Sequence, residues 1–406
     1  MFLFYCSLAI IAVVSAKNEE YMGFRVYNLT FSTQEQQDKF HLLKSDLIEF
    51  WQRPNLQRNV VGQAMVPPSH FPWFEEQLEK LGIERSLHVT DVFEFLKEKD
   101  PTPMLRNNRN FDYTDFYRYN EILNHLNTLK ESYANNPNIN VDIIQHGVTD
   151  QNRPLVYLKI SRATTAIRPV VIIEAGIIPN EWITIPAVLN TVDRILEGSA
   201  YLDAFDWIVV PVVNPDGYEY THTNLRLWSK SRSTRSNLGI ICPGVNINRN
   251  FDLDWSHFDS SSSPCSHLYA GVEPFSEPET KLLKHLIDEY GTRTRLYLSL
   301  QNNGGFLTYP WHFEKAASGM FRQHHLTGID AVNAMNENYI LGAASVVFGE
   351  RASGTSVDYV RSNGLLYTFN IDIVQRGNGV LIPAGEIRSI VDDVWRGISA
   401  IVNSII

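Results

Sequence analysis

From about residue 110 onward, short apolar runs alternate with amphipathic helical patterns, and this alternation limits the possible folds more than any other feature of the chain. Short apolar runs bounded by turn residues predict strands that are buried on both faces. The helical patterns between them predict helices that cover such a sheet, so this region is expected to be an α/β domain with a mostly buried sheet. Strands are expected at 170–175, 207–213, 295–300 and 365–371, and helices at 181–197, 276–290 (with a Ser276/Glu279 capping box) and 385–403.

A smaller unit with a different pattern precedes this region. Its short strands and helices predict an α+β fold, and Ser32 and Glu35 fit the capping box that begins a helix. A polar stretch rich in Pro and Asn follows from about residue 97 and carries Arg106 and Arg109, so it is interpreted as an exposed linker that a trypsin-like protease could cut. In this unit, strands are expected at 24–31, 59–68 and 86–92, and helices at 32–50 and 69–83.

The N-terminal residues and the net charge predict the compartment of the protein and the partners that it does not bind. The first sixteen residues are apolar and end in Val-Ser-Ala, which predicts a secretory signal cleaved after Ala16. A signal anchor is the alternative, but the run is short for a bilayer span, and no other apolar run is long enough. A net charge of −10 disfavours non-specific nucleic-acid binding. We therefore expect a secreted, extracellular protein that binds neither nucleic acid nor membrane.

The cysteines support the same compartment. Of the three in the chain, Cys6 would leave with the signal. Cys242 and Cys265 remain, and an even number of cysteines in an oxidising compartment favours a single disulfide between them.

Polar side chains follow the predicted strands of the larger region at the point where each strand ends. In α/β sheets the active crevice lies beyond the carboxyl ends of the strands. The residues there are Glu181, Asn214, Asp216, Gln301 and Asp372. They predict a site at this edge of the sheet; the alternative is that they only cap helices and satisfy turns.

Several long motifs then make the chain recognisable: PVVNPDGYEYTHTNLRLWSKSRS, GVNINRNFDLDW, SSSPCSHLYAG and LIPAGEI. In this order they resemble the signatures of the digestive zinc carboxypeptidases of the A/B type. The resemblance implies a mixed, twisted sheet flanked by helices and zinc-dependent removal of one residue from a peptide's C-terminus. It implies an activation-propeptide-like domain at 17–105 and a carboxypeptidase-like domain at 110–406. The predicted signal peptide at 1–16 precedes these domains, and the linker with possible cleavage sites, at 106–109, joins them.

The residues that hold zinc in this family are mostly replaced in this chain. The resemblance places the first zinc histidine at Ile178, the ligand glutamate at Glu181 and the second histidine at Gln301. An aliphatic side chain cannot bind a metal, and a catalytic zinc needs three ligands from His, Cys or carboxylate. None of the 12 histidines forms a His-Glu-x-x-His pair that could replace the lost ones. We therefore expect no bound zinc.

Other positions of the family's active site differ as well. The resemblance keeps the substrate-carboxylate clamp as Asn248 and Arg249, and the selectivity position as Val357, an apolar choice that His312 could crowd. It also matches Cys242 with Cys265 as the disulfide pair. Four positions are degenerate. Asn180 and Ser229 replace two arginines, and the resemblance gives the one at 229 the role of stabilising the oxyanion. Glu350 replaces the tyrosine that closes over the substrate, and Asp372 replaces the general-base glutamate with a shorter side chain.

Three hypotheses follow from these replacements. The first is a secreted pseudoenzyme without a cofactor, whose cleft binds a peptide or protein C-terminus or a cationic ligand. A cationic ligand is considered because the cleft loses the two charges of zinc and two arginines and gains Glu350, a shift of about five charges toward negative. The second is an active zinc carboxypeptidase that releases apolar C-terminal residues. The third is a calcium site in an acidic cleft, formed by Glu181, Glu350, Asp372 and Gln301, since oxygen ligands suit that ion. In the first case Arg249 is expected to be the main cation near the carboxylates.

Overall fold

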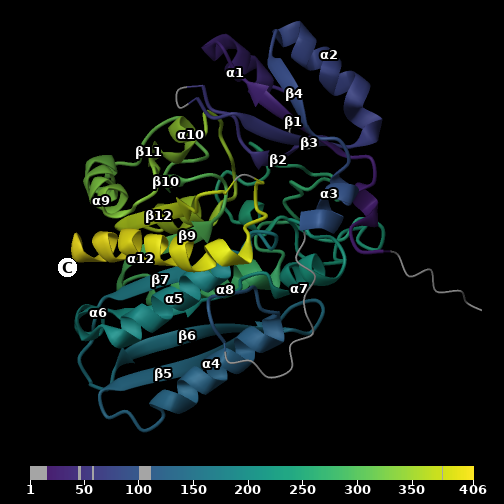
Figure 1. Cartoon of the computed structure of the whole chain (residues 1–406). Helices are drawn as coiled ribbons and strands as arrows, with labels where there is room; N and C mark the ends of the chain where they lie inside the picture. Colours follow the sequence, from purple (N-terminus) through teal and green to yellow (C-terminus); the bar gives the residue numbers. More distant parts are fainter. Residues whose placement is uncertain (1–15, 44–46, 57–58, 100–110, 377) are drawn as a thin grey trace, which may run out of the picture.

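Eight strands form one mixed sheet at the centre of the larger unit, in the order β11-β10-β12-β9-β7-β8-β6-β5 (Figure 1). The computed structural model describes residues 16–43, 47–56, 59–99, 111–376 and 378–406. The middle strands β12, β9, β7 and β8 run parallel, whereas β6 and β5 continue the sheet antiparallel. The strands are β5 Ile139–Val148, β6 Pro154–Arg162, β7 Val170–Glu174, β8 Asp206–Val210, β9 Thr294–Gln301, β10 Phe306–Tyr309, β11 Ile340–Ala343 and β12 Tyr367–Asp372.

The two faces of this sheet are covered by different helices. In β7, Val171 and Ile173 belong to the hydrophobic cluster that contains α4, α5 and α12, whereas Val170 and Ile172 belong to the cluster that contains α8 and α11. Successive strand side chains point to opposite faces, so an unbroken apolar run requires cover on both sides. The helices are α4 Tyr119–Tyr133, α5 Thr184–Glu197, α6 Ser199–Ala204, α7 Pro215–Thr223, α8 Pro278–Tyr290, α9 Phe321–Ala334, α10 Ala344–Val347, α11 Ser356–Ser362 and α12 Ile387–Asn403.

The N-terminal unit, residues 16–99, has its own four-stranded antiparallel sheet in the order β2-β3-β1-β4. Figure 1 shows it against the larger unit, with β2 on the side that faces the central sheet. The predicted fold class, a helix-flanked mixed sheet preceded by a small α+β unit, is confirmed. The elements are β1 Arg25–Thr30, α1 Gln34–His41, β2 Glu49–Gln52, β3 Gly62–Val66, α2 Phe71–Leu81, β4 Glu84–Val89 and α3 Val92–Lys99, with 3₁₀ turns at Glu19–Tyr21, Pro68–His70, Ile247–Arg249 and Ala384–Glu386.

Four predictions about local structure are wrong. The helix expected at 32–50 ends at His41, and β2 begins at Glu49. Its cap is Thr33, whose side chain accepts the backbone N–H of Gln36 at 3.2 Å, and not Ser32. The helix expected from 276 begins at Pro278 without a side-chain cap. The linker expected from residue 97 begins later, because α3 continues to Lys99.

The remaining predictions concern the disulfide, the signal sequence and the linker. The disulfide is confirmed: Cys242 and Cys265 are bonded, with Cα atoms 4.8 Å apart. Residues 1–15 of the predicted signal sequence and the two linker arginines, Arg106 and Arg109, lie outside the described residues. None of the helices that the structure describes is both long and apolar enough to cross a membrane.

Candidate functional site

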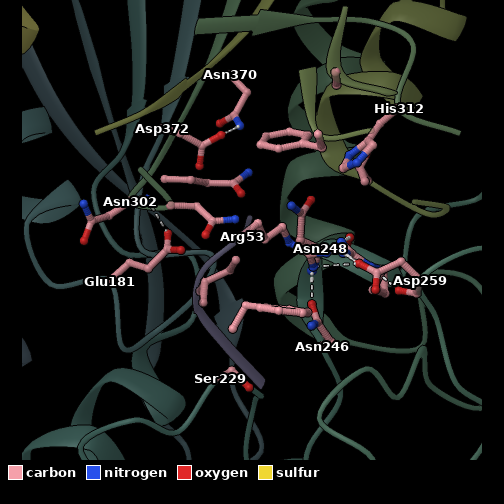
Figure 2. A pocket seen from close by; sticks show the side chains of 18 of the residues that line it. Arg53, Glu181, Ser229, Asn246, Asn248, Asp259, Asn302, His312, Asn370 and Asp372 are labelled. Carbon is pink, nitrogen blue, oxygen red and sulfur yellow. Dashed lines mark hydrogen bonds and ion pairs between the residues drawn. The ribbon is translucent and has the colours of Figure 1, made fainter. Parts of the chain in front are cut away.

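A cleft lies beyond the carboxyl ends of β7, β9 and β12, where the sequence predicts a site. Because these strands are parallel, their last residues meet at one edge of the sheet. Glu181, Gln301 and Asp372 line this cleft. In Figure 2, Glu181, Asn302 and Asp372 lie on one side of the pocket.

Two of the residues expected in the cleft are absent from it. Asn214 caps α7 by accepting the N–H of Gly217 at 2.9 Å. Asp216 accepts hydrogen bonds from Thr149 Oγ1 and from Arg153, both at 2.7 Å. These two side chains satisfy local structure, which is the alternative that the sequence left open.

The positions implied for zinc ligands come together, but they do not form a zinc-binding set. Ile178 offers no donor atom. Gln301 contributes a neutral amide, and its Nε2 donates to Ser299 Oγ at 3.2 Å. Glu181 is buried and accepts the backbone N–H of Asn302 at 2.9 Å. In the described part of the chain, no group of three His, Cys, Asp or Glu side chains is arranged to hold a metal. One carboxylate and one amide do not supply the three ligands that a catalytic zinc requires.

Two buried carboxyl groups of the cleft, Glu181 and Asp372, have raised pKa values. Burial raises the pKa of Glu181 well above its usual value, and the charges of Asp372 and Glu174 raise it further. Burial also raises the pKa of Asp372 to about 7, although Asn370 Nδ2 donates to its carboxylate at 2.7 Å. Glu181 therefore acts as a hydrogen-bonded carboxyl group in a low-dielectric pocket.

The two arginines that the family places in the cleft are replaced here by the uncharged side chains of Asn180 and Ser229. Ser229 lines the pocket. Asn180 Nδ2 donates to the backbone oxygen of Leu227 at 2.8 Å. A nearby arginine, Arg226, is buried away from the cleft: it donates to the Asn180 carbonyl at 2.8 Å and stacks on Trp182, 3.7 Å from the ring centroid. The Ser229 side chain itself carries no charge that could stabilise an oxyanion.

The residues of the expected carboxylate clamp are already engaged. The Asn248 side-chain oxygen accepts the N–H of Ser356 at 3.0 Å. Arg249 Nε donates to the backbone oxygen of Asp259 at 2.7 Å, and its Nη2 pairs with the Asp259 carboxylate. Val357, the expected selectivity residue, lines the same pocket.

His312 lines this part of the pocket too. It is packed against Phe348, with ring centroids 5.1 Å apart. Burial, together with the charge of Arg249, lowers its pKa to about 3, so the imidazole is neutral at pH 7.

A cation from the N-terminal unit enters the cleft, and sequence reasoning missed it. Arg53 follows β2 and pairs with Asp259 at 3.1 Å through Nη2, and with Glu350 through Nη1. Figure 2 shows Arg53 between the Glu181 side of the pocket and Asp259. The expectation that Glu350 faces Glu181 and Asp372, with Arg249 as their main cation, is wrong. Arg53 is the cation that pairs with Glu350, and its charge partly opposes the rise in the pKa of Asp372 that burial causes.

Further contacts hold the N-terminal unit over the cleft. The Trp51 backbone oxygen accepts from Gln375 Nε2 at 2.7 Å, and His41 Nδ1 lies 3.2 Å from the Gly349 oxygen. Asn55 Nδ2 donates to the Val347 oxygen at 2.5 Å. Residues 48–51 line the pocket together with residues of the larger unit. No local sequence signal reveals these contacts, because each joins positions about three hundred residues apart.

Comparisons with known proteins agree with this architecture. A family model described as zinc carboxypeptidase matches residues 122–397, and one described as carboxypeptidase activation peptide matches residues 27–99. Carboxypeptidase B of Helicoverpa zea is 33% identical over 420 residues, which cover 97% of this chain and 96% of the relative. Carboxypeptidase A2 of Mus musculus is 29% identical and covers 95% of each chain. The crystal structure of carboxypeptidase A from Helicoverpa armigera matches with a TM-score of 0.86 at 27% identity, over 95% of this chain and 98% of that one.

Proposed function

The chain belongs to the zinc carboxypeptidase family, and from that premise we propose that it is a secreted member that binds through its cleft without zinc and without peptidase turnover. The observation that carries the proposal is the donor set at the metal position: Ile178, Glu181 and Gln301 line the cleft together, and only one of them is a usual zinc ligand. In this family the metal activates the attacking water, so the chemistry depends on that set.

Two further features support the loss of turnover. Ser229 is too short to replace an arginine at the oxyanion position, and the loss of one such donor typically lowers the rate by about 10²–10³-fold. Asp372 has a shorter side chain than the glutamate implied at the general-base position, and a misplacement of about an ångström can lower the rate by roughly 10²-fold. Arg249 is paired with Asp259, so it is a poor clamp for a substrate carboxylate.

The proposal extends to processing and binding. We propose that residues 1–16 direct secretion, that residues 17–105 act as the propeptide-like domain and that residues 106–109 link it to the carboxypeptidase-like domain. A calcium site is not favoured, because Glu350 pairs with Arg53 and, among the described residues, no group of three acidic, His or Cys side chains is arranged to hold a metal. N-terminal sequencing of the secreted protein tests these boundaries.

Metal analysis combined with an activity assay tests the central proposal. The purified full chain is incubated with zinc and dialysed, and its metal content is measured before and after limited trypsin treatment. It is then assayed on peptides with apolar C-terminal residues. We expect well under one zinc per chain and no released amino acid. Stoichiometric zinc with release of C-terminal residues would establish the alternative, an active metallocarboxypeptidase.

A further inference from the structure

We propose that this cleft is a receptor for a guanidinium group, supplied by an arginine side chain of a partner peptide, and that Arg53 is its intramolecular occupant. The inference rests on the proposed function, because it assumes a cleft that binds and does not hydrolyse. We call three residues of the larger unit the guanidinium seat: Asp259 and Glu350, which pair with Arg53, and Arg249, which pairs with Asp259. It differs from the selectivity position, where Val357 is apolar.

The geometry of the seat fits a forked cation. Arg53 uses two different terminal nitrogens: Nη2 reaches Asp259 at 3.1 Å, and Nη1 pairs with Glu350. A guanidinium presents several N–H donors in one plane, so it can satisfy two carboxylates at fixed positions. A lysine ammonium is a single point charge and cannot place separate nitrogens on both acids. The seat therefore selects arginine over lysine.

The charge of the seat also requires a cation. Asp259 and Glu350 contribute two negative charges, and Arg249 contributes one positive charge, which leaves one negative charge when Arg53 is withdrawn. His312 is neutral and does not compensate. The side chain of Asp259 is only 4% exposed, and its Oδ1 has no hydrogen-bond partner among the described residues. A buried carboxylate that keeps an open acceptor atom favours an incoming donor.

The same arrangement disfavours the ligand that the family's clamp would hold. An incoming peptide carboxylate would have to separate Arg249 from Asp259 and would then face Glu350. Placing like charges together in a buried site is unfavourable. Where the family's clamp binds an anionic carboxylate, the guanidinium seat of this chain therefore binds a cation.

Arg53 competes with any partner because it belongs to the same chain. A tethered group has a high effective concentration near its site. The contacts of Trp51, Asn55 and His41 hold this tether in place. The intact protein should bind external guanidinium groups weakly, and removal of the Arg53 side chain should expose the seat.

Calorimetry on full-chain variants tests the proposal. The probe is N-acetyl-arginine amide, which carries a guanidinium group and no terminal charges. We expect Arg53→Ala to bind it at least tenfold more tightly than the wild type. The lysine analogue should bind at least tenfold more weakly, and the uncharged citrulline analogue should not bind. Adding Asp259→Asn to Arg53→Ala should abolish the increase in affinity for the probe. The control Arg85→Ala, at an exposed arginine of β4, should bind the probe as weakly as the wild type does.

A second variant tests whether the result with Arg53→Ala comes from a folding defect. Arg53→Met keeps an aliphatic side chain and removes only the charge and the hydrogen-bond donors. It should therefore show the same increase in affinity for the probe as Arg53→Ala. Failure of both variants to bind the probe would overturn the proposal, as would binding that survives Asp259→Asn. Zinc-dependent turnover would overturn the proposed function alone, because none of the zinc positions belongs to the seat.

Discussion

Arg249 donates from Nε to the backbone oxygen of Asp259 over 2.7 Å and pairs through Nη2 with the carboxylate of the same residue. Arg249 is the cation that a carboxypeptidase of this family would use to hold a substrate carboxylate. Here its positive charge is matched by a fixed acid ten positions along the chain. The presence of the arginine in the sequence therefore does not imply a working clamp.

Removing the acids should return the clamp to its family role. The triple variant Arg53→Ala/Asp259→Ala/Glu350→Gln leaves Arg249 as the only charged group of the seat, so its net charge changes from negative to positive. We expect this variant to bind N-acetyl-phenylalanine, whose carboxylate faces Arg249 and whose ring lies beside Val357, at least tenfold more tightly than Arg53→Ala does. Calorimetry measures this. N-acetyl-phenylalanine amide is the control ligand, and equal binding of the two ligands would contradict the prediction.

Buried Asp358 should make stability depend on pH. It accepts the backbone N–H groups of His312 at 2.8 Å and Phe313 at 2.9 Å, yet burial raises its pKa to about 7. The folded-state pKa of Asp358 lies above its unfolded value of about 4. The stability that Asp358 contributes is therefore fully present below pH 4 and is lost as the pH rises through 7. The variant Asp358→Asn has no such titration.

The measurement is the difference in melting temperature between wild type and Asp358→Asn from pH 4 to pH 8. We expect the wild type's relative stability to fall by a few degrees across this range. Other titrating groups, such as Glu174 and His324, are present in both proteins and cancel in the difference. A difference that stays constant or grows with pH would show that Asp358 is ionised without penalty in the folded state.

The central strands could be predicted from the sequence because their signal is local. β7 spans Val170–Glu174 where 170–175 is expected, and burial on both faces is what makes such a run continuously apolar. The helix predicted at 32–50 is longer than the observed one because the apolar residues after His41 continue a plausible helical pattern. β10 and β11 have only four residues each, which is too short for a periodic signal.

The cleft shows the same division between local and distant information. Ile178 and Gln301 stand within motifs, so the resemblance locates them without a structure. Asp259 and Arg53 lie in no recognised motif and are 206 positions apart, so only the docked N-terminal unit reveals their pairing. The sequence predicts an acidic cleft but does not reveal Arg53, the cation that pairs with Asp259 and Glu350 there.

Buried Arg226 should be a structural cation and not a catalytic one. It is 1% exposed, donates to the backbone oxygens of Asn180 at 2.8 Å and Val380 at 3.1 Å, and stacks on Trp182. Arg226→Ala should lower the free energy of unfolding by about 3 kcal/mol, because it leaves charge-assisted hydrogen bonds unmade. Denaturant unfolding measures the loss. Arg85→Ala, at the exposed position, should change it by less than about 0.5 kcal/mol.

Restoring the two imidazoles should restore metal binding. Ile178 and Gln301 line the cleft with Glu181, so Ile178→His/Gln301→His would provide two nitrogens and one carboxylate, the three-ligand set that zinc accepts. We expect about one zinc per chain after dialysis, with retention that weakens on acidification, because metal binding requires Glu181 to lose its proton and its pKa is raised.

The single variants Ile178→His and Gln301→His are the matched controls, since each supplies only two good ligands and should retain much less zinc. Peptidase activity should remain low even in the zinc-loaded double variant, because Ser229 offers no oxyanion cation and Arg53 still pairs within the cleft. Retention of zinc by the unaltered chain at the level of the double variant would contradict the prediction. It would show that the aliphatic and amide side chains at these two positions do not prevent metal binding.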